Sequence, residues 1–287
     1  MIKKTIVNIK ELKNLTQVND NLIIIDCSAD LIDKKFGLKN FAENSIPSAI
    51  HIDLEKVLSG NSYGIKGRHP LPVLPKFLYW LTSNNINNKT TIIAYDRNNN
   101  LYSARLWWYL KKIGHNKTYV LDGGLAAWEK NKFYIKKKKT YPKKKFFKRI
   151  SNFNEFSTKF IENNLETKKY LLIDARSSDR FNGLNENIDK VAGKIPFSIN
   201  RYFLKNLDDS GLFKSRQKLN QEFRLLIKNN TPSRIIHQCG SGISACHNLL
   251  AMEYANLRGS SIYIGSWSEW IREKRPIISQ TYHTKSP

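Results

Sequence analysis

Short apolar runs alternate with longer helical segments along this chain. Residues 22–25, 91–95 and 170–173 are almost wholly apolar and show no alternation with polar residues, and the run 234–238 is interpreted as a further short buried strand. Runs of this kind are typical of parallel strands that are buried on both faces. Segments such as 104–112 and 245–255 have the composition and length of helices. The pattern predicts an α/β fold with mostly parallel sheets flanked by helices, in which functional loops follow the carboxyl ends of the strands.

The same order of segments occurs twice. Residues 22–30 match 170–178, 45–50 match 194–199, 91–96 match 234–239, and 120–128 match 263–270. Four matches in the same order indicate two copies of one domain. We therefore expect a first domain over 1–135 and a second over 151–287. The lysine-rich stretch 136–150 between them is a predicted linker, because like charges keep it extended and Pro142 interrupts a helix.

Cys239 is the strongest candidate for chemistry. It lies between a predicted strand, 234–238, and a predicted helix that begins near Ala245, in the sequence Cys239-Gly-Ser-Gly-Ile-Ser244. The unpaired amides and the positive dipole end of such a helix stabilise a thiolate, which is the nucleophilic form of cysteine. Gly240 and Gly242 allow the loop to curl around the sulfur. The alternative is a buried structural cysteine beside a glycine turn.

The residues around Cys239, and the residue at its position in the first copy, indicate which chemistry the cysteine could carry out. Cysteine phosphatases with a similar loop place an arginine six positions after the nucleophile, and this chain has Ala245 there. A phosphate dianion would lack its guanidinium clamp, so sulfur transfer fits better. In the first copy the position of Cys239 is occupied by Asp96. A carboxylate cannot act as a sulfur nucleophile, so the first domain is predicted to be catalytically inactive.

Composition excludes several other classes. The chain has three cysteines, Cys27, Cys239 and Cys246, which argues against a disulfide framework and fits a reducing cytoplasm. No apolar run is long enough for a transmembrane helix, and the first residues are a poor signal peptide, so we expect a cytoplasmic protein with no membrane association. We expect Cys246 to pack as a small buried residue, although a redox role is an alternative.

The net charge of +24 raises the possibility of nucleic-acid binding. Lysine, asparagine and isoleucine are abundant together, as expected from AT-rich codons, and no nucleic-acid motif is present. We therefore predict no specific nucleic-acid partner. The alternative would show a steep dependence of affinity on salt.

These residues together resemble tandem-domain rhodanese-type sulfurtransferases over nearly the whole chain. An active cysteine loop in the second copy and an acidic residue in the first are that family's arrangement. The loop 239–246 and the tail 265–270 are similar to those of 3-mercaptopyruvate sulfurtransferases. Thiosulfate-preferring members carry two cationic residues directly after the cysteine, where this chain has Gly240 and Ser241. Thiosulfate therefore remains the alternative donor, and a non-catalytic persulfide carrier or binding module is a third hypothesis.

The resemblance implies a reaction and a set of roles. Cys239 would take sulfur from 3-mercaptopyruvate, release pyruvate and pass the sulfur from its persulfide to cyanide or to a thiol acceptor such as thioredoxin. No metal and no organic cofactor would be needed. Substrate binding would fall to Arg180, whose guanidinium suits a carboxylate, and to the loop residues Gly240, Gly242, Ile243 and Ser244.

A catalytic relay is implied as well. Ser241 would polarise the donor or pass a proton, His69 would complete a relay with it, and Glu55 would orient His69. The chain also departs from the family. A second substrate arginine is expected several residues beyond Arg180, where this chain has Asn185-Glu-Asn-Ile-Asp-Lys190. Lys190 is the substitute that the sequence offers, as a point charge without the planar fork. Arg176 is interpreted as structural.

Overall fold

The chain folds into two compact units. They are seen in a computed structural model that describes residues 4–135 and 153–279. The first unit comprises Met1–Gly60, Leu71–Phe153 and Asp209–Phe213, and the second comprises Asn61–Pro70, Asn154–Asp208 and Lys214–Pro287. Two short segments, 61–70 and 209–213, thus belong to the unit opposite to that of their neighbours in sequence. The predicted linker 136–150 lies outside the described residues.

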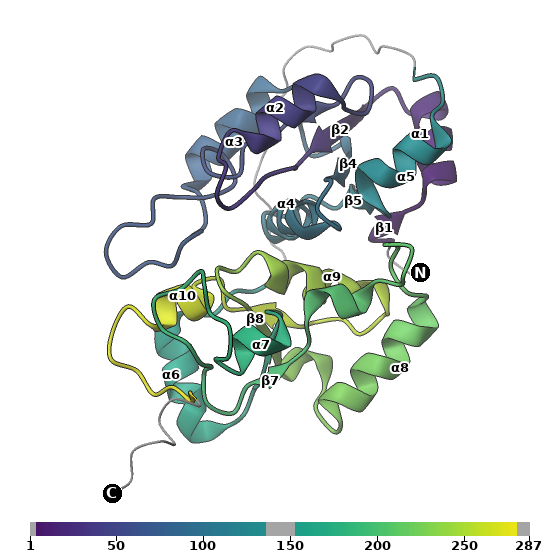
Figure 1. The fold of residues 1–287 in the computed structure, drawn as a ribbon. Coiled ribbons are helices and arrows are strands. Elements are labelled where there is room, and N and C mark those ends of the chain that lie inside the picture. Colours follow the sequence, from purple (N-terminus) through teal and green to yellow (C-terminus); the bar gives the residue numbers. More distant parts are fainter. Residues whose placement is uncertain (1–3, 136–152, 280–287) are drawn as a thin grey trace, which may run out of the picture. The chain divides into compact units, whose positions relative to one another are not determined.

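The first unit is built on a parallel sheet in the order β1-β5-β4-β2-β3 (Figure 1). Its strands are β1 (Ile6–Val7), β2 (Leu22–Asp26), β3 (Ile50–His51), β4 (Thr91–Tyr95) and β5 (Thr118–Leu121). The β4 residues are all buried, as expected for a central parallel strand with both faces covered. The apolar runs at 22–25 and 91–95 therefore form buried parallel strands, as predicted, and the sheet order places β4 at the centre.

Helices cover this sheet on both faces. They are α1 (Ile9–Val18), α2 (Phe36–Glu43), α3 (Leu74–Ser83), α4 (Leu101–Lys112) and α5 (Gly124–Asn131). Leu12 of α1 and Trp128 of α5 share a core cluster with Ile93 and Tyr95 of β4. Strand side chains alternate between faces, so Ile92 and Ala94 point the other way, toward the side where α4 packs on β4 (Figure 1).

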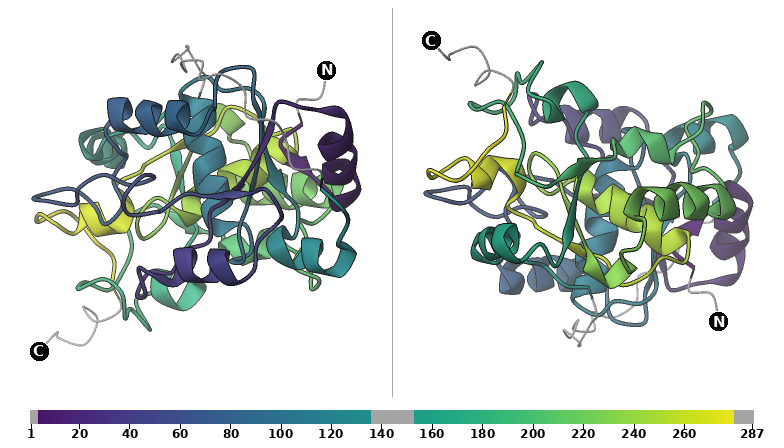
Figure 2. Two further views of the ribbon diagram at one scale, coloured as in Figure 1. Left: turned by 90° about the horizontal axis from the view of Figure 1, so that it is seen from above. Right: turned by 90° about the horizontal axis from the view of Figure 1, so that it is seen from below.

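The second unit repeats the design with the parallel order β7-β6-β8-β9. Its strands are β6 (Leu171–Asp174), β7 (Ile199–Asn200), β8 (Ile235–Gln238) and β9 (Ser261–Ile262). Its helices are α6 (Thr158–Thr167), α7 (Ser178–Phe181), α8 (Arg216–Ile227), α9 (Ser244–Tyr254) and α10 (Ser266–Trp270), with 3₁₀ turns η1 (Phe203–Asn206) and η2 (Pro232–Arg234). Helix α9 packs on β8 and beside α8, as the views in Figure 2 show.

The register of the two sheets relates the copies residue by residue. In the first unit Asp26 at the end of β2 pairs with Tyr95 of β4. In the second unit Asp174 at the end of β6 pairs with Gln238 of β8. The next residue along each central strand is Asp96 or Cys239. The two side chains therefore occupy equivalent places at the carboxyl edge of their sheets, as the sequence repeat predicted.

Within the ranges 4–135 and 153–279, the structure contains no helix with the length and apolar character needed to cross a membrane.

Candidate active site

Cys239 lies directly after β8 and before α9. Its side chain is buried, with 2% of the residue exposed. The amide of Gly242 donates a hydrogen bond to Cys239 Sγ at 3.1 Å. An amide donor at a sulfur stabilises negative charge on that sulfur, and the α9 amino terminus adds its positive dipole end. The geometry therefore suits a thiolate.

The loop needs glycine at position 242. Gly242 has φ +76°, and an added Cβ would lie 2.4 Å from the carbonyl oxygen of Ile264. Both the left-handed backbone and the close approach exclude a side chain there. At Gly240 the space beside the Cα is limited by side chains, because an added Cβ would lie 3.1 Å from Arg68 Nη2 and 3.5 Å from Arg180 Nη2. Two arginine side chains from elsewhere in the chain therefore lie over this glycine.

The first turn of α10 holds the loop in place. Ser266 Oγ accepts from the amide of Cys239 at 3.1 Å and donates to the carbonyl of Tyr263 at 2.8 Å. The amides of Trp267 and Ser268 donate to the carbonyls of Cys239 and Gly240 at 2.9 and 2.8 Å. The tail 265–270 thus has a structural role, because its residues fix the backbone of the nucleophile.

Ser241 and His69 meet in the second unit. His69 Nδ1 lies 2.9 Å from Ser241 Oγ, and both residues are buried. The segment that carries His69 is tied to α10, because the amide of Gly67 donates to Glu269 Oε2 at 3.1 Å and that of Arg68 donates to Ser268 Oγ at 3.0 Å. Residues that are far apart in sequence thus form the hydrogen-bonded pair that a proton relay requires.

Arg176 is enclosed in a buried ionic network. Its Nη2 donates to Asp174 Oδ2 at 2.8 Å and to the carbonyl of Gly193 at 2.8 Å. Its Nη1 lies 3.4 Å from Glu186 Oε2, and its guanidinium stacks on Trp267 with the carbon 4.9 Å from the ring centroid. Every side of the group has a partner, which agrees with the structural role predicted for it.

Arg180 approaches the loop but is also paired. Its Nε donates to the two Glu186 oxygens at 3.0 and 3.1 Å, and its Nη2 lies 3.1 Å from Asp189 Oδ2. Burial would raise the pKa of Glu186, but hydrogen bonds from Arg180 and from the amides of Asp189 and Ile188 hold it below its ordinary value. The predicted substrate arginine is therefore neutralised by two acidic neighbours.

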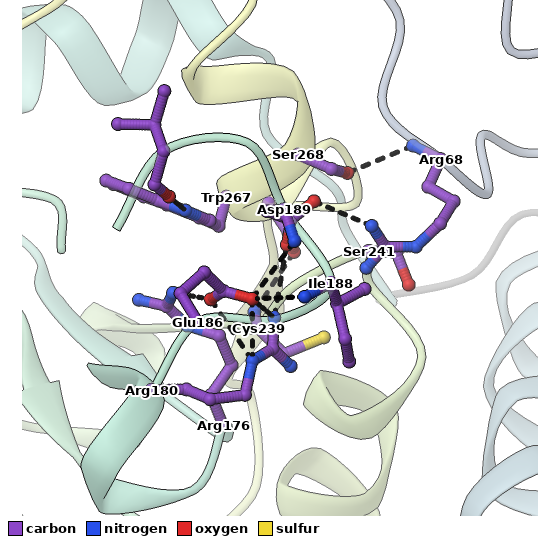
Figure 3. A network of polar contacts seen from close by, with 12 residues as sticks. Arg68, Arg176, Arg180, Glu186, Ile188, Asp189, Cys239, Ser241, Trp267 and Ser268 are labelled. Atoms are coloured by element: carbon purple, nitrogen blue, oxygen red, sulfur yellow. Dashed lines mark hydrogen bonds and ion pairs between the residues drawn. The ribbon is translucent and has the colours of Figure 1, made fainter. Parts of the chain in front are cut away.

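Asp189 joins two arginines (Figure 3). Its Oδ1 accepts from Arg68 Nη1 at 2.6 Å, while its Oδ2 faces Arg180. The sequence interpretation missed Arg68 and assigned its kind of role to Lys190, which is exposed. The sequence did hold one indication of this role: Arg68 directly precedes His69, which was itself predicted to belong to the site.

The loop of the first unit shows what such amides can bind. Asp96 Oδ1 accepts from the amides of Asn98 and Asn100 at 2.8 and 2.9 Å. Asp96 Oδ2 accepts from those of Tyr102 and Ser103 at 2.9 and 2.8 Å. Burial raises the pKa of Asp96, while these hydrogen bonds oppose the rise. A loop of this shape thus directs four amides at one anionic group.

The remaining predicted residues are placed as follows. Ile243 and Ser244 lead the loop into α9, and Cys246 Sγ donates to the carbonyl of Gly242 at 3.3 Å from a buried position. Glu55 belongs to the first unit, so its action on His69 stays a prediction. In the part of the chain that the structure describes, no group of three or more His, Cys, Asp or Glu side chains could hold a metal ion.

Comparison with known proteins agrees with this geometry. Residues 8–131 and 157–273 each match the rhodanese-like domain. A probable 3-mercaptopyruvate sulfurtransferase of Pseudomonas aeruginosa is 34% identical over 90% of this chain and 93% of its own length. Bovine (Bos taurus) thiosulfate sulfurtransferase is 29% identical over 91% and 88%. The chain therefore belongs to the rhodanese family and consists of two rhodanese-like domains.

Solved structures show the same fold. A 3-mercaptopyruvate sulfurtransferase from Leishmania major superposes with a TM-score of 0.80 at 24% identity, covering 94% of this chain and 75% of that protein. The tandem α/β architecture predicted from the sequence is thus confirmed.

Proposed function

We propose that this protein is a sulfurtransferase that moves sulfane sulfur from 3-mercaptopyruvate to a thiol or to cyanide through a persulfide on Cys239. The observation that carries the proposal is the position of Cys239 Sγ, 3.1 Å from the amide of Gly242 in the loop that precedes α9. The family membership and the similarity to a probable 3-mercaptopyruvate sulfurtransferase support it.

In the first half-reaction the Cys239 thiolate attacks the sulfur of 3-mercaptopyruvate. The carbon–sulfur bond breaks, its electron pair goes to the methylene carbon as an enolate, and protonation of that carbon yields pyruvate. Ser241 and His69 are proposed to supply this proton or to stabilise the enolate oxygen. Arg180, next to the loop, is proposed to bind the donor's carboxylate.

In the second half-reaction a thiolate or cyanide attacks the outer sulfur and restores the Cys239 thiolate. The persulfide is proposed to rest on the loop amides from Gly240 to Ser244. The amide cradle that holds the Asp96 carboxylate in the first unit supports this assignment. We propose that a small thiol or a dithiol protein such as thioredoxin is the acceptor. A cytoplasmic location remains a prediction from Cys27, Cys239 and Cys246, which form no disulfide within the described residues.

Thiosulfate is the second candidate donor, because the bovine relative is a thiosulfate sulfurtransferase. Neither position after the cysteine carries a cation, which disfavours a compact dianion. The Arg68 and Arg180 side chains, however, place two cations near Gly240 from outside the loop. Thiosulfate is therefore included as a donor in the test.

The test measures pyruvate formation from 3-mercaptopyruvate with dithiothreitol, beside thiocyanate formation from thiosulfate and cyanide. Cys239→Ser is the active-site variant, and Cys246→Ser is the matched control because it makes the same substitution at another buried cysteine. We expect 3-mercaptopyruvate to be preferred, activity to vanish in the first variant and to persist in the second.

Other results would revise the proposal. A preference for thiosulfate would replace the proposed donor. Full activity in Cys239→Ser would refute the mechanism. A folded protein that gains one sulfur atom on the Cys239 peptide, but turns over neither donor, would be a persulfide carrier.

A further inference from the structure

Arg68, Asp189 and Arg180 form a bridge beside the nucleophile. The Asp189 carboxylate binds Arg68 Nη1 at 2.6 Å through one oxygen and Arg180 Nη2 at 3.1 Å through the other. The bridge lies over Gly240, since an added Cβ there would be 3.1, 3.5 and 3.6 Å from Arg68 Nη2, Arg180 Nη2 and Asp189 Oδ2. Gly240 is the residue directly after Cys239, so the bridge borders the place where a donor must bind.

The two arginines differ in how fully they are paired. Arg180 is bound by both Glu186 oxygens in addition to Asp189. Arg68 has its Nη1 on Asp189, whereas its Nε is buried and has no hydrogen-bond partner among the described residues. Arg68 therefore retains donor capacity on the guanidinium that faces Gly240. A planar guanidinium with free donors is the group best suited to a second carboxylate.

Charge makes Asp189 an obstacle to that second carboxylate. Its side chain is 4% exposed, and its amide is fixed by Glu186 Oε1 at 3.0 Å. The positive charges of Arg68 and Arg180 are balanced by the negative charges of Asp189 and Glu186, so the bridge offers little net attraction to an anion. A donor that binds Arg68 must share it with Asp189 or displace Asp189, and either event costs free energy.

We propose that Asp189 is a specificity-determining residue that competes with the donor's carboxylate for Arg68 and thereby sets the affinity for carboxylate donors. This inference rests on the proposed function. Arg68 supplies the second guanidinium, which the sequence lacks in the stretch after Arg180. It comes from the segment 61–70, which belongs to the second unit.

The experiment uses Asp189→Asn, which keeps the shape and one of the two acceptor oxygens but removes the charge. Glu166→Gln is the control, because it changes the net charge equally at an exposed carboxylate of the same unit. In the full-length enzyme we expect Asp189→Asn to lower KM for 3-mercaptopyruvate by about three- to tenfold, as expected when one charge-assisted partner of a guanidinium is removed, with little change in kcat. Arg68→Ala should raise KM, and Glu166→Gln should leave it unchanged.

A second readout does not depend on turnover. Pyruvate, the proposed product, carries the same carboxylate, and its Kd can be measured by calorimetry on Cys239→Ser protein. Adding Asp189→Asn should tighten pyruvate binding by a similar factor, and adding Arg68→Ala should weaken it. If Asp189→Asn leaves both KM and the pyruvate Kd unchanged or raises them in an active enzyme, this inference is wrong and the proposed function stands. Absence of wild-type turnover refutes the proposed function. The pyruvate Kd values alone then show whether Asp189 competes with a bound carboxylate for Arg68.

Discussion

The imidazole of His237 makes the stability of the second unit sensitive to acid. His237 lies in β8 with no exposed surface, and neither ring nitrogen has a hydrogen-bond partner within the described part of the chain. Burial lowers the pKa of His237 from 6.5 to about 3. The ring is therefore neutral in the folded protein at a pH where it is already protonated in the unfolded chain.

The sign and size of the effect follow from linkage. Because the folded-state pKa is depressed, the full stability is present above pH 6.5 and is lost progressively as the pH falls toward 3. Between the unfolded pKa of 6.5 and about pH 5, a range of about 1.5 pH units, the unfolded chain binds a proton at His237 that the folded chain does not. The expected loss from this single group between about pH 7.5 and pH 5 is about 2 kcal/mol.

The assay is urea unfolding of wild type and His237→Leu at both pH values. We expect wild type to lose about 2 kcal/mol more than the variant between them, because leucine cannot be protonated. His237→Ala is the second variant, since Ala94 occupies the equivalent position in β4 of the first unit. Equal losses in wild type and both variants would refute the reasoning, since another group would then carry the acid sensitivity.

Two further predictions concern the relay and the inactive loop. Ser241→Ala and His69→Ala should each lower kcat for 3-mercaptopyruvate by about 100-fold, and the double variant should lose little more, because the 2.9 Å contact joins them in one relay. Steady-state kinetics test this, and losses that multiply would contradict a shared path. Asp96→Asn should destabilise the first unit by about 2 kcal/mol, because its amide group would turn N–H donors toward the amides of Tyr102 and Ser103. Urea unfolding at neutral pH measures this loss, and an unchanged midpoint would mean that those amides need no acceptor.

The local features of the fold could be predicted from short stretches of sequence. The run 234–238 forms β8 over Ile235–Gln238, and the helix expected near Ala245 begins at Ser244. The equivalence of the Asp96 and Cys239 positions followed from the internal repeat and agrees with the register of the two sheets. These inferences succeed because apolar periodicity and glycine placement act over a few residues.

The residues over Gly240 could not be found in this way. Spacing along the chain pointed to Lys190 as the second cation, yet Arg68 meets Asp189 across 121 positions of sequence. The backbone between Arg180 and Asp189 also carries Glu186 onto the guanidinium that was expected to be available to a substrate.

The tandem α/β architecture and the single reactive loop could both be inferred from the amino-acid sequence. Strand burial, the loop glycines and the presence of aspartate in one copy and cysteine in the other are all local properties. The charges around Cys239 became known from the folded chain, in which segment 61–70 brings Arg68 to Asp189 and His69 to Ser241. The physical reason is that the Coulomb interaction depends on distance through space, and the folded path of the backbone sets that distance.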